Sequence, residues 1–274
     1  ATVLEVQASQ VLTDFYGSVP YSEANNISIL EPKYDSGEDI YDFMIADLDL
    51  DLSKDLSTSK GEVPGSDDLI FGGDLDNWTK FANTLKLKIF MRQINSSRSA
   101  IGISGVNSLL TSGVEFLNVD AAVTQFEDAP SLSNPLYETD RRQLNTATNL
   151  RMSTTLSSYF VENNDPRKAK YYGAGVALNQ GDFESQVPVA SSVAVVELSA
   201  TTPAYLMSKE ESLFLQAEAQ ARYGSGAKEL YDAAVIENFS KYDLDGSSFV
   251  ASDGAYEFPS SGTLEEKIEA IITQ

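Results

Sequence analysis

Four segments of the chain place apolar residues at the three- and four-residue spacing of a helix. Residues 36–56, SGEDIYDFMIADLDLDLSKDL, open on Ser36, a predicted N-cap with Asp39 three positions later. Residues 76–95, DNWTKFANTLKLKIFMRQIN, give the clearest helical pattern in the chain. The predicted stripes are Ile40, Phe43, Met44, Asp47 and Leu48 in the first segment, and Trp78, Phe81, Ala82, Leu85, Ile89 and Arg92 in the second.

The other two periodic segments predict an antiparallel helical hairpin. Residues 208–224, SKEESLFLQAEAQARYG, begin at Ser208 with Glu211 at the capping-box position, and residues 225–242, SGAKELYDAAVIENFSKY, follow directly. Small and bulky residues alternate along both helices, as close packing in tetratricopeptide hairpins requires. One hairpin cannot bury its own apolar face, so we expect the earlier helices and a short helix within residues 263–274 to cover it.

Residues 120–207 lack helical periodicity over most of their length. Within them Val193–Ala200, VAVVELSA, fits a short strand and an extended loop equally well. Long irregular segments on a rigid helical scaffold usually carry binding, so we expect a ligand site in this region.

Composition and charge exclude several functional classes. The chain has 274 residues, no His, no Cys and a formal net charge of −22. Disulfides, thiolate metal sites and histidine-dependent catalysis are therefore excluded, which leaves carboxylate pairs, Ser with Lys, or a metal held by oxygen ligands. The acid excess would repel phosphate backbones, so we expect no nucleic acid partner. No apolar run reaches the roughly 18 residues that a membrane span needs.

These segments, in this order, resemble the SusD/RagB family of nutrient-binding outer-membrane lipoproteins of Bacteroidetes, particularly its SusD-like branch. The resemblance covers most of the chain, and it rests on the collinear order of motifs that are weak singly. The motifs are DFYGSVPYSEA (residues 14–24), PKYDSGEDIYDFMIADLD (Pro32–Asp49), DNWTKFANTLKLKIFMRQI (Asp76–Ile94), NPLY (Asn134–Tyr137), NNDPRKAKYY (Asn163–Tyr172) and LFLQAEAQARYGSGAKELYDAAVIENF (residues 213–239).

The resemblance implies a mostly α-helical single domain over residues 1–274. Its tetratricopeptide-like right-handed α-superhelix would span about residues 1–120 and 205–274, with a loop-rich insert at about 120–205 that builds the ligand site. It also implies a non-enzymatic cell-surface protein without a cofactor. Such a protein captures an oligosaccharide, or in some members a peptide, and passes it to a SusC-like TonB-dependent transporter in the outer membrane.

Two departures from the family pattern bear on membrane attachment and length. The lipid-anchored cysteine that family members carry near the N-terminus is absent, and the chain stops at IITQ, before a segment in which relatives continue with a further helix. We therefore expect a sequence shortened at both ends, and attachment to the membrane through a lipid anchor is inferred from the family alone.

The aromatic stretch TDFYGSVPYSEA (residues 13–24) is expected to be structural rather than catalytic. The resemblance places this turn between the first helix and the rest of the scaffold. Gly17 and Pro20 set a turn, and Phe15, Tyr16 and Tyr21 are expected to pin that turn to the helices by burying their rings.

A carbohydrate site needs flat rings for sugar C–H faces and polar side chains for hydroxyls. The single Trp, Trp78, lies on an apolar helical stripe and is expected in the core. The candidates are therefore loop residues, and ordinary ring packing or an ion-pair cluster around Asp140 are the alternatives for them. The candidate ligand-binding residues are Tyr137, Arg141, Arg142, Tyr171, Tyr172, Phe183, Tyr256 and Phe71.

Two further motifs have structural explanations. In DPR, Asp165–Arg167, the proline stops a helix and the arginine is expected to pair with a nearby acid. Acid-rich stretches at Asp47–Ser53 and at Asp243 and Asp245 raise the question of calcium. Acids at every second helical position face different directions, and the second stretch lacks the bidentate Glu of an EF-hand, so solvated acids are the default expectation.

Two rival functions stay open at this stage. A tetratricopeptide-type adaptor would bind a protein segment in a concave groove, whereas small-ligand capture would place exposed aromatic residues on loops outside the superhelix. An α/α carboxylate glycoside hydrolase is the second rival, although 41 acids guarantee carboxylate pairs by chance. No Gly-x-Ser-x-Gly elbow or phosphate-binding loop is present.

Overall fold

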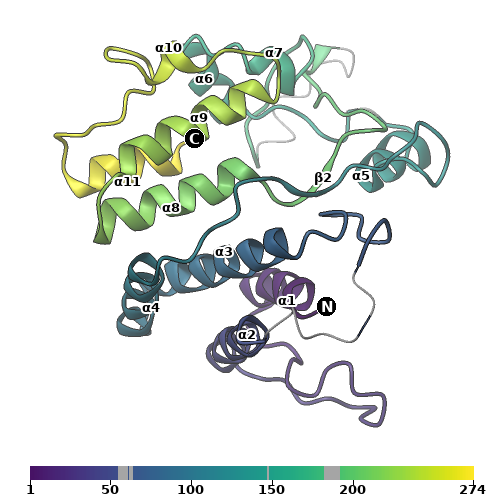
Figure 1. The fold of residues 1–274 in the computed structure, drawn as a ribbon. Helices are drawn as coiled ribbons and strands as arrows, with labels where there is room; N and C mark the ends of the chain where they lie inside the picture. The colour runs from purple at the N-terminus through teal and green to yellow at the C-terminus, as the bar shows by residue number, and fades with distance from the viewer. Residues whose placement is uncertain (55–60, 62–63, 147, 182–191) are drawn as a thin grey trace.

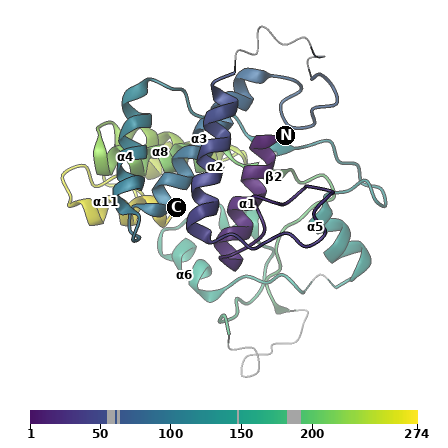
Figure 2. The same cartoon turned by 90° about the horizontal axis from the view of Figure 1, so that it is seen from below.

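The N-terminal half of the fold is a set of packed helices. The structure is a computed structural model that describes residues 1–54, 61, 64–146, 148–181 and 192–274. Figures 1 and 2 show the first three helices side by side, with the fourth packed on the third. These four helices are α1 (Thr2–Tyr16), α2 (Gly37–Leu52), α3 (Leu75–Gln93) and α4 (Ser99–Ser112).

Local capping fixes where the two predicted N-terminal helices begin. The Ser36 side chain accepts the backbone N–H of Asp39, and the Asp74 side chain accepts those of Asp76 and Asn77. The predicted cap at Ser36 is therefore confirmed, and α3 begins one residue earlier than its predicted segment. Sequence pattern did not predict α4, whose GISG core is poor in strong helix formers.

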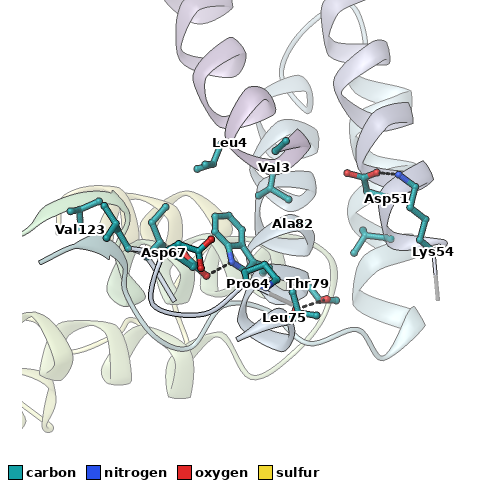
Figure 3. A pocket seen from close by; sticks show the side chains of 16 residues that line it. Val3, Leu4, Asp51, Lys54, Pro64, Asp67, Leu75, Thr79, Ala82 and Val123 are labelled. Carbon is teal, nitrogen blue, oxygen red and sulfur yellow. Dashed lines mark hydrogen bonds and ion pairs between the residues drawn. The ribbon is translucent and has the colours of Figure 1, made fainter. Parts of the chain in front are cut away.

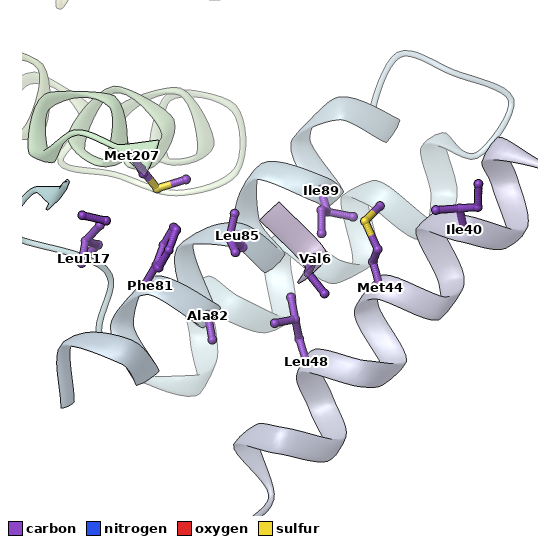
Figure 4. Close-up of a cluster of buried hydrophobic side chains, with 11 residues drawn as sticks. Val6, Ile40, Met44, Leu48, Phe81, Ala82, Leu85, Ile89, Leu117 and Met207 are labelled. Atoms are coloured by element: carbon purple, nitrogen blue, oxygen red, sulfur yellow. The ribbon is translucent and has the colours of Figure 1, made fainter. Parts of the chain in front are cut away.

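A hydrophobic core forms where α1, α2 and α3 meet. Figure 4 shows Ile40, Met44 and Leu48 of α2 facing α3, as the stripe predicted. Phe43, also on that predicted stripe, is an exposed residue and stacks on Tyr21 with a 6.0 Å centroid separation. This first cluster consists of Val6, Ile40, Met44, Leu48, Phe81, Ala82, Leu85, Ile89, Leu117, Ala121 and Met207.

The C-terminal half contains the predicted hairpin. α8 (Lys209–Tyr223) and α9 (Ala227–Ser240) run antiparallel, and α8 also lies against α3 (Figure 1). Gly226 before α9 has a φ of 84°, a left-handed conformation that glycine adopts without strain. The Ser208 side chain accepts the Glu211 N–H as expected. The short helices α10 (Ser247–Val250) and α11 (Leu264–Ile272) complete this half, and α11 carries a full capping box.

A two-stranded antiparallel sheet closes the base of the loop-rich insert. β1 (Ala121–Val123) pairs with β2 (Ala204–Met207), although neither strand was predicted. The intervening segment holds α5 (Pro135–Tyr137), the π-helical turn η2 (Glu138–Gln143), α6 (Thr154–Glu162) and α7 (Lys168–Tyr171). The Val193–Ala200 stretch is extended and makes isolated bridges, for example Tyr172 with Val196.

The expectation for the aromatic turn is wrong for two of its three rings. Phe15 is 80% exposed and Tyr16 is 75% exposed, because the last turn of α1 extends past the core. Tyr21 is half-buried and its hydroxyl donates to Asp47 over 2.7 Å. Asp35 holds the turn by accepting the backbone N–H groups of Tyr21 and Ser22. Within the part of the chain that the structure describes, no helix combines the length and apolar character of a membrane span.

Candidate functional site

Tyr137 and Arg142 meet at the outer end of the insert. Asn134 caps α5 by accepting the N–H groups of Leu136 and Tyr137, and the following π-helical turn brings Arg142 back over the Tyr137 ring. The guanidinium carbon of Arg142 lies 5.5 Å from the ring centroid. Arg142 is also paired with Asp128 and with Glu138, so its charge is already engaged within the loop.

Arg141 connects this turn to the extended segment at residues 193–197. Its guanidinium pairs with the buried Asp140, and its Nη2 donates to the Val196 carbonyl over 2.9 Å. Val196 in turn bridges Tyr172 in the backbone. The structure therefore links two groups of candidates through one segment, with Arg141 serving as the connection.

Tyr171 is largely occupied by packing, whereas Tyr172 faces a hollow. The Tyr171 ring stands edge-on to Tyr242 at 4.8 Å, and its hydroxyl donates to Asn238 over 2.9 Å. Burial raises the pKa of both Tyr171 and Tyr172. The half-buried Tyr172 is one wall of the hollow, so of these two rings it is the one placed to meet a ligand.

The hollow beside Tyr172 has a volume of about 630 Å³. Glycines shape it: Gly175 has a φ of 152°, and a side chain there would collide with the backbone at Val193 and Ala194. The backbone at Gly175 can thus pass close to residues 193–197, and no side chain from this position fills the hollow. The side chains of Met152, Asp165, Pro166, Lys168, Tyr172 and Glu197 are among its lining.

Tyr256 is a core residue in this structure. It is 4% exposed, and its ring is stacked on Tyr159 at 5.9 Å and on Phe249 at 5.5 Å. Its hydroxyl donates to Asp165 over 2.6 Å. Burial raises the pKa of Tyr256, and the hydrogen bond to Asp165 adds to that increase. Because both ring faces are covered, a sugar has no surface to stack on here.

The remaining two candidate rings lie elsewhere. Phe71 is half-buried and stands edge-on to Trp78 at 5.0 Å and to Phe81 at 6.1 Å, as part of the packing around α3. Phe183 lies outside the residues that the structure describes.

The DPR motif forms a buried ion pair, as its sequence predicted. Arg167 is 3% exposed, and both its Nε and its Nη2 donate to Asp165. Its guanidinium carbon also lies 4.3 Å from the Phe239 ring centroid. Asp165 thus has its charge balanced, even though it reaches the edge of the hollow beside Tyr172.

A larger hollow of about 670 Å³ lies beside Trp78, where α1 and α3 begin and α2 ends (Figure 3). Trp78 packs against the first cluster, as predicted, and its Nε1 donates to Asp68 over 2.7 Å. Burial acts to raise the pKa of Asp68, but the Trp78 hydrogen bond and three backbone N–H donors together outweigh it and lower that pKa. The hollow is lined mainly by aliphatic side chains, including Val3, Leu4 and Leu75.

Sequence reasoning missed a groove along α8. Two hollows of about 490 and 290 Å³ share Glu211, Leu215 and Glu218, and the first extends to Arg92 on α3. The larger hollow lies between α8 and α3 and the smaller one lies beside α9 and α11, so the groove depends on elements far apart in sequence and no local motif could have indicated it.

The acid-rich stretches are dispersed rather than clustered. Asp47 accepts from Tyr21, Asp49 pairs with Lys86 and Asp51 pairs with Lys54. Among the described residues no group of three or more Asp or Glu side chains is arranged to hold a metal ion.

Comparison with known proteins identifies the family. A family described as starch-binding and associating with the outer membrane, SusD-like, matches residues 1–274. A search of curated proteins gave no match. Among solved structures, a SusD homolog from Bacteroides uniformis ATCC 8492 has a TM-score of 0.82 at 24% identity, over 99% of this chain and 63% of that one.

Two further solved structures agree with this fold. A chitin-binding SusD homolog from Flavobacterium johnsoniae gives a TM-score of 0.80 at 22% identity, over 99% of this chain and 63% of that one. A SusD homolog from Bacteroides vulgatus ATCC 8482 gives 0.75 at 23% identity, over 99% and 62%. The chain thus spans less than two thirds of the length of these relatives. The mostly helical, tetratricopeptide-like architecture expected from sequence is confirmed, and the chain belongs to the SusD-like branch of the SusD/RagB family.

Proposed function

We propose that this protein captures an oligosaccharide in the hollow beside Tyr172 and does not cleave it. The observation that carries the proposal is a half-buried aromatic ring, an ammonium group and a carboxylate around one open space of about 630 Å³. The description of the family as starch-binding supports a carbohydrate, as does the chitin-binding relative.

The chemistry of the lining suits a sugar. A pyranose presents C–H groups that pack on an aromatic face and hydroxyls that both donate and accept hydrogen bonds. Tyr172 supplies the ring, the Lys168 ammonium donates, and the Glu197 carboxylate accepts. Ligand sites typically combine an apolar wall with a few such polar groups.

Capture without cleavage is supported by the state of the carboxylates at the hollow. Glycoside hydrolysis needs two working carboxyl groups: one donates a proton to the leaving group, and the other acts as nucleophile or activates the attacking water. Asp165 is held by two guanidinium N–H donors of Arg167 and by the Tyr256 hydroxyl. That leaves Glu197 as the unengaged carboxylate among the lining residues described above.

We further propose that the captured glycan is delivered to a SusC-like TonB-dependent transporter at the cell surface. The family association with the outer membrane supports this location. A lipid anchor would hold the full-length protein there, and the tetratricopeptide-like scaffold would present the insert to the transporter.

The proposal is tested by titration calorimetry of the protein against oligosaccharides of several linkages and against peptides. We expect saturable binding of an oligosaccharide class, weakened about tenfold or more by Tyr172→Ala, which corresponds to about 1.4 kcal/mol. Tyr16→Ala is the matched control, because Tyr16 is 75% exposed at the end of α1 and does not line the hollow. Absence of oligosaccharide binding by folded protein, or an equal loss in both variants, would contradict the proposal.

A protein-binding role is a second candidate because of the groove along α8. Its shared residues Glu211, Leu215 and Glu218 combine acids with an apolar side chain, as a groove for a polypeptide segment would. Peptide binding that survives Tyr172→Ala and is lost in Leu215→Asp, with helical content unchanged, would favour this function.

A further inference from the structure

Positive charge without an ion pair is concentrated, among the described residues, on the elements around the hollow beside Tyr172. In the part of the chain that the structure describes, every Lys and Arg forms an ion pair except Arg151, Lys168, Lys170 and Lys267. With 41 acids and 19 basic residues in the chain, an unpaired cation is the exception. Three of these four lie between residues 151 and 170.

These three cations belong to the elements that build the hollow. Lys168 lines it directly, and Lys170 is an exposed residue on the same helix, α7. Arg151 precedes Met152, which is also part of the lining. The backbone of Arg151 forms a bridge with Val195, and that of Tyr172, just after α7, forms one with Val196. The cations therefore lie on the two stretches of backbone that pair with the extended segment.

The acids at the hollow leave this charge uncompensated. Asp165 is balanced by Arg167 in the buried ion pair. Glu197 lines the hollow and forms no ion pair in the described structure. Among the described residues, the unpaired Glu197 and the unpaired Lys168 therefore both line the hollow, and the unpaired Lys170 and Arg151 lie on the elements that build it, in a protein whose formal charge is −22.

An anionic ligand would gain most from this arrangement. An ammonium that breaks no internal ion pair gives its full charge-assisted hydrogen bond to a ligand anion. At physiological ionic strength the Debye length is about 8 Å, so charges lining the hollow outweigh the distant acid excess. Glu197 is left to accept hydrogen bonds from sugar hydroxyls.

On the basis of the proposed function, we propose that the captured oligosaccharide is acidic and carries a uronate carboxylate or a sulfate ester. Lys168 binds the anionic group, and Lys170 and Arg151 attract it to the hollow. Tyr172 stacks on the sugar ring, so the site recognises both the ring and its anionic group.

The test compares oligosaccharides of equal length that differ in charge. Titration calorimetry is carried out with a neutral galactan oligomer, an oligogalacturonate and a sulfated galactan oligomer. We expect at least one acidic ligand to bind about tenfold or more tightly than the neutral one, and its affinity to fall as NaCl is raised. The uronate and sulfate arms show which anion the hollow accepts.

Two variants locate the effect. Lys168→Gln is expected to weaken acidic binding about tenfold and neutral binding by clearly less, so that the preference for the acidic ligand falls. Lys267→Gln is the matched control, because Lys267 is equally unpaired but lies on α11 and does not line the hollow. Equal losses in the two variants would overturn the inference.

The outcomes separate this inference from the proposed function. Oligosaccharide binding that shows no preference for acidic ligands would overturn the inference and leave glycan capture intact. Absence of binding by any oligosaccharide would overturn both. Binding of acidic peptides alone would also overturn both, and would indicate a peptide ligand.

Discussion

At the scale of single residues, Arg167 joins several distant parts of the described chain. Besides its pair with Asp165, its guanidinium donates to Asn238 on α9 and to Gln274 at the end of the chain. Burial opposes its charge, and the hydrogen bond to Asp165 leads the interactions that raise its pKa. One residue thus joins the insert to α9 and to the segment after α11.

We predict that Arg167→Ala lowers the free energy of unfolding by about 3 to 5 kcal/mol, because it leaves the Asp165 carboxylate buried and unpaired. Urea denaturation followed by circular dichroism measures the change. Lys228→Ala is the control: it removes a partly exposed pair with Asp232 and should cost about 1 kcal/mol or less. Equal costs for the two variants would refute the structural role of Arg167.

Residue-scale predictions from sequence succeeded where the partner is close along the chain. The arginine of DPR indicated an ion pair, which exists, whereas the helix expected to run up to the proline already ends at Glu162. Tyr256 appeared to be a free loop ring because its partner Asp165 lies 91 positions away. The prediction that Phe15 and Tyr16 are buried was wrong because aromatic character alone does not show which side chains reach the core.

At the scale of elements, α4 shows how tertiary packing overrides local preference. Its Gly102 and Gly105 lie against Phe90 of α3, and a Cβ on Gly102 would come within 2.7 Å of the Phe90 carbonyl oxygen. A Cβ on Gly105 would enter the Phe90 ring itself. These glycines weaken the helix in isolation and permit its close approach to α3.

We predict that Gly105→Ala destabilises the protein by about 1 to 3 kcal/mol, although alanine favours a helix over glycine by about 1 kcal/mol. The reason is overpacking against the Phe90 ring. Thermal denaturation of Gly105→Ala and of Ser104→Ala, a change at an exposed neighbouring position, provides the comparison. A higher melting temperature for Gly105→Ala would show that α4 does not pack as described.

Elements with their own caps and stripes were predictable, and elements that depend on neighbours were not. α2, α3, α8, α9 and α11 carry caps or apolar periodicity in their own sequences. β1 and β2 are short and pair across more than 80 residues of chain, so neither shows a strand pattern by itself. The hollow beside Tyr172 depends on similar long-range contacts, which explains why Tyr172 alone among the described candidate residues lines it.

At the scale of the whole molecule, α8 connects the hydrophobic clusters. Leu215 packs against the first cluster and against a third one, formed by Leu87, Met91, Ile94, Val106, Leu109 and Ala219. Ala217 on the same helix belongs to the second cluster, formed by Ala217, Ala227, Tyr231, Val235, Phe239, Val250, Tyr256, Phe258 and Ile271. The two halves of the chain therefore share one helix in their cores.

We predict that the two halves unfold in one cooperative transition. Trp78, the single Trp, reports the first cluster by fluorescence, whereas far-ultraviolet circular dichroism reports all helices. The urea midpoints from the two probes should coincide, because α8 couples the clusters. Separate midpoints would indicate that the halves unfold independently, as weakly coupled repeats do.

The whole-molecule architecture was predictable mainly because the motifs occur in the order typical of one family. The order of helices indicated the scaffold, whereas the placement of the insert depends on contacts that no local pattern encodes. The central claim of ligand capture therefore rests on the geometry around Tyr172 rather than on sequence.

The measurement that tests this claim most directly is a crystal structure with the tightest-binding oligosaccharide from the calorimetric panel. We predict density for a sugar ring on Tyr172, with Lys168 and Glu197 in hydrogen-bonding contact. Density only beside Trp78 or along the α8 groove, with the hollow at Tyr172 empty, would contradict the account.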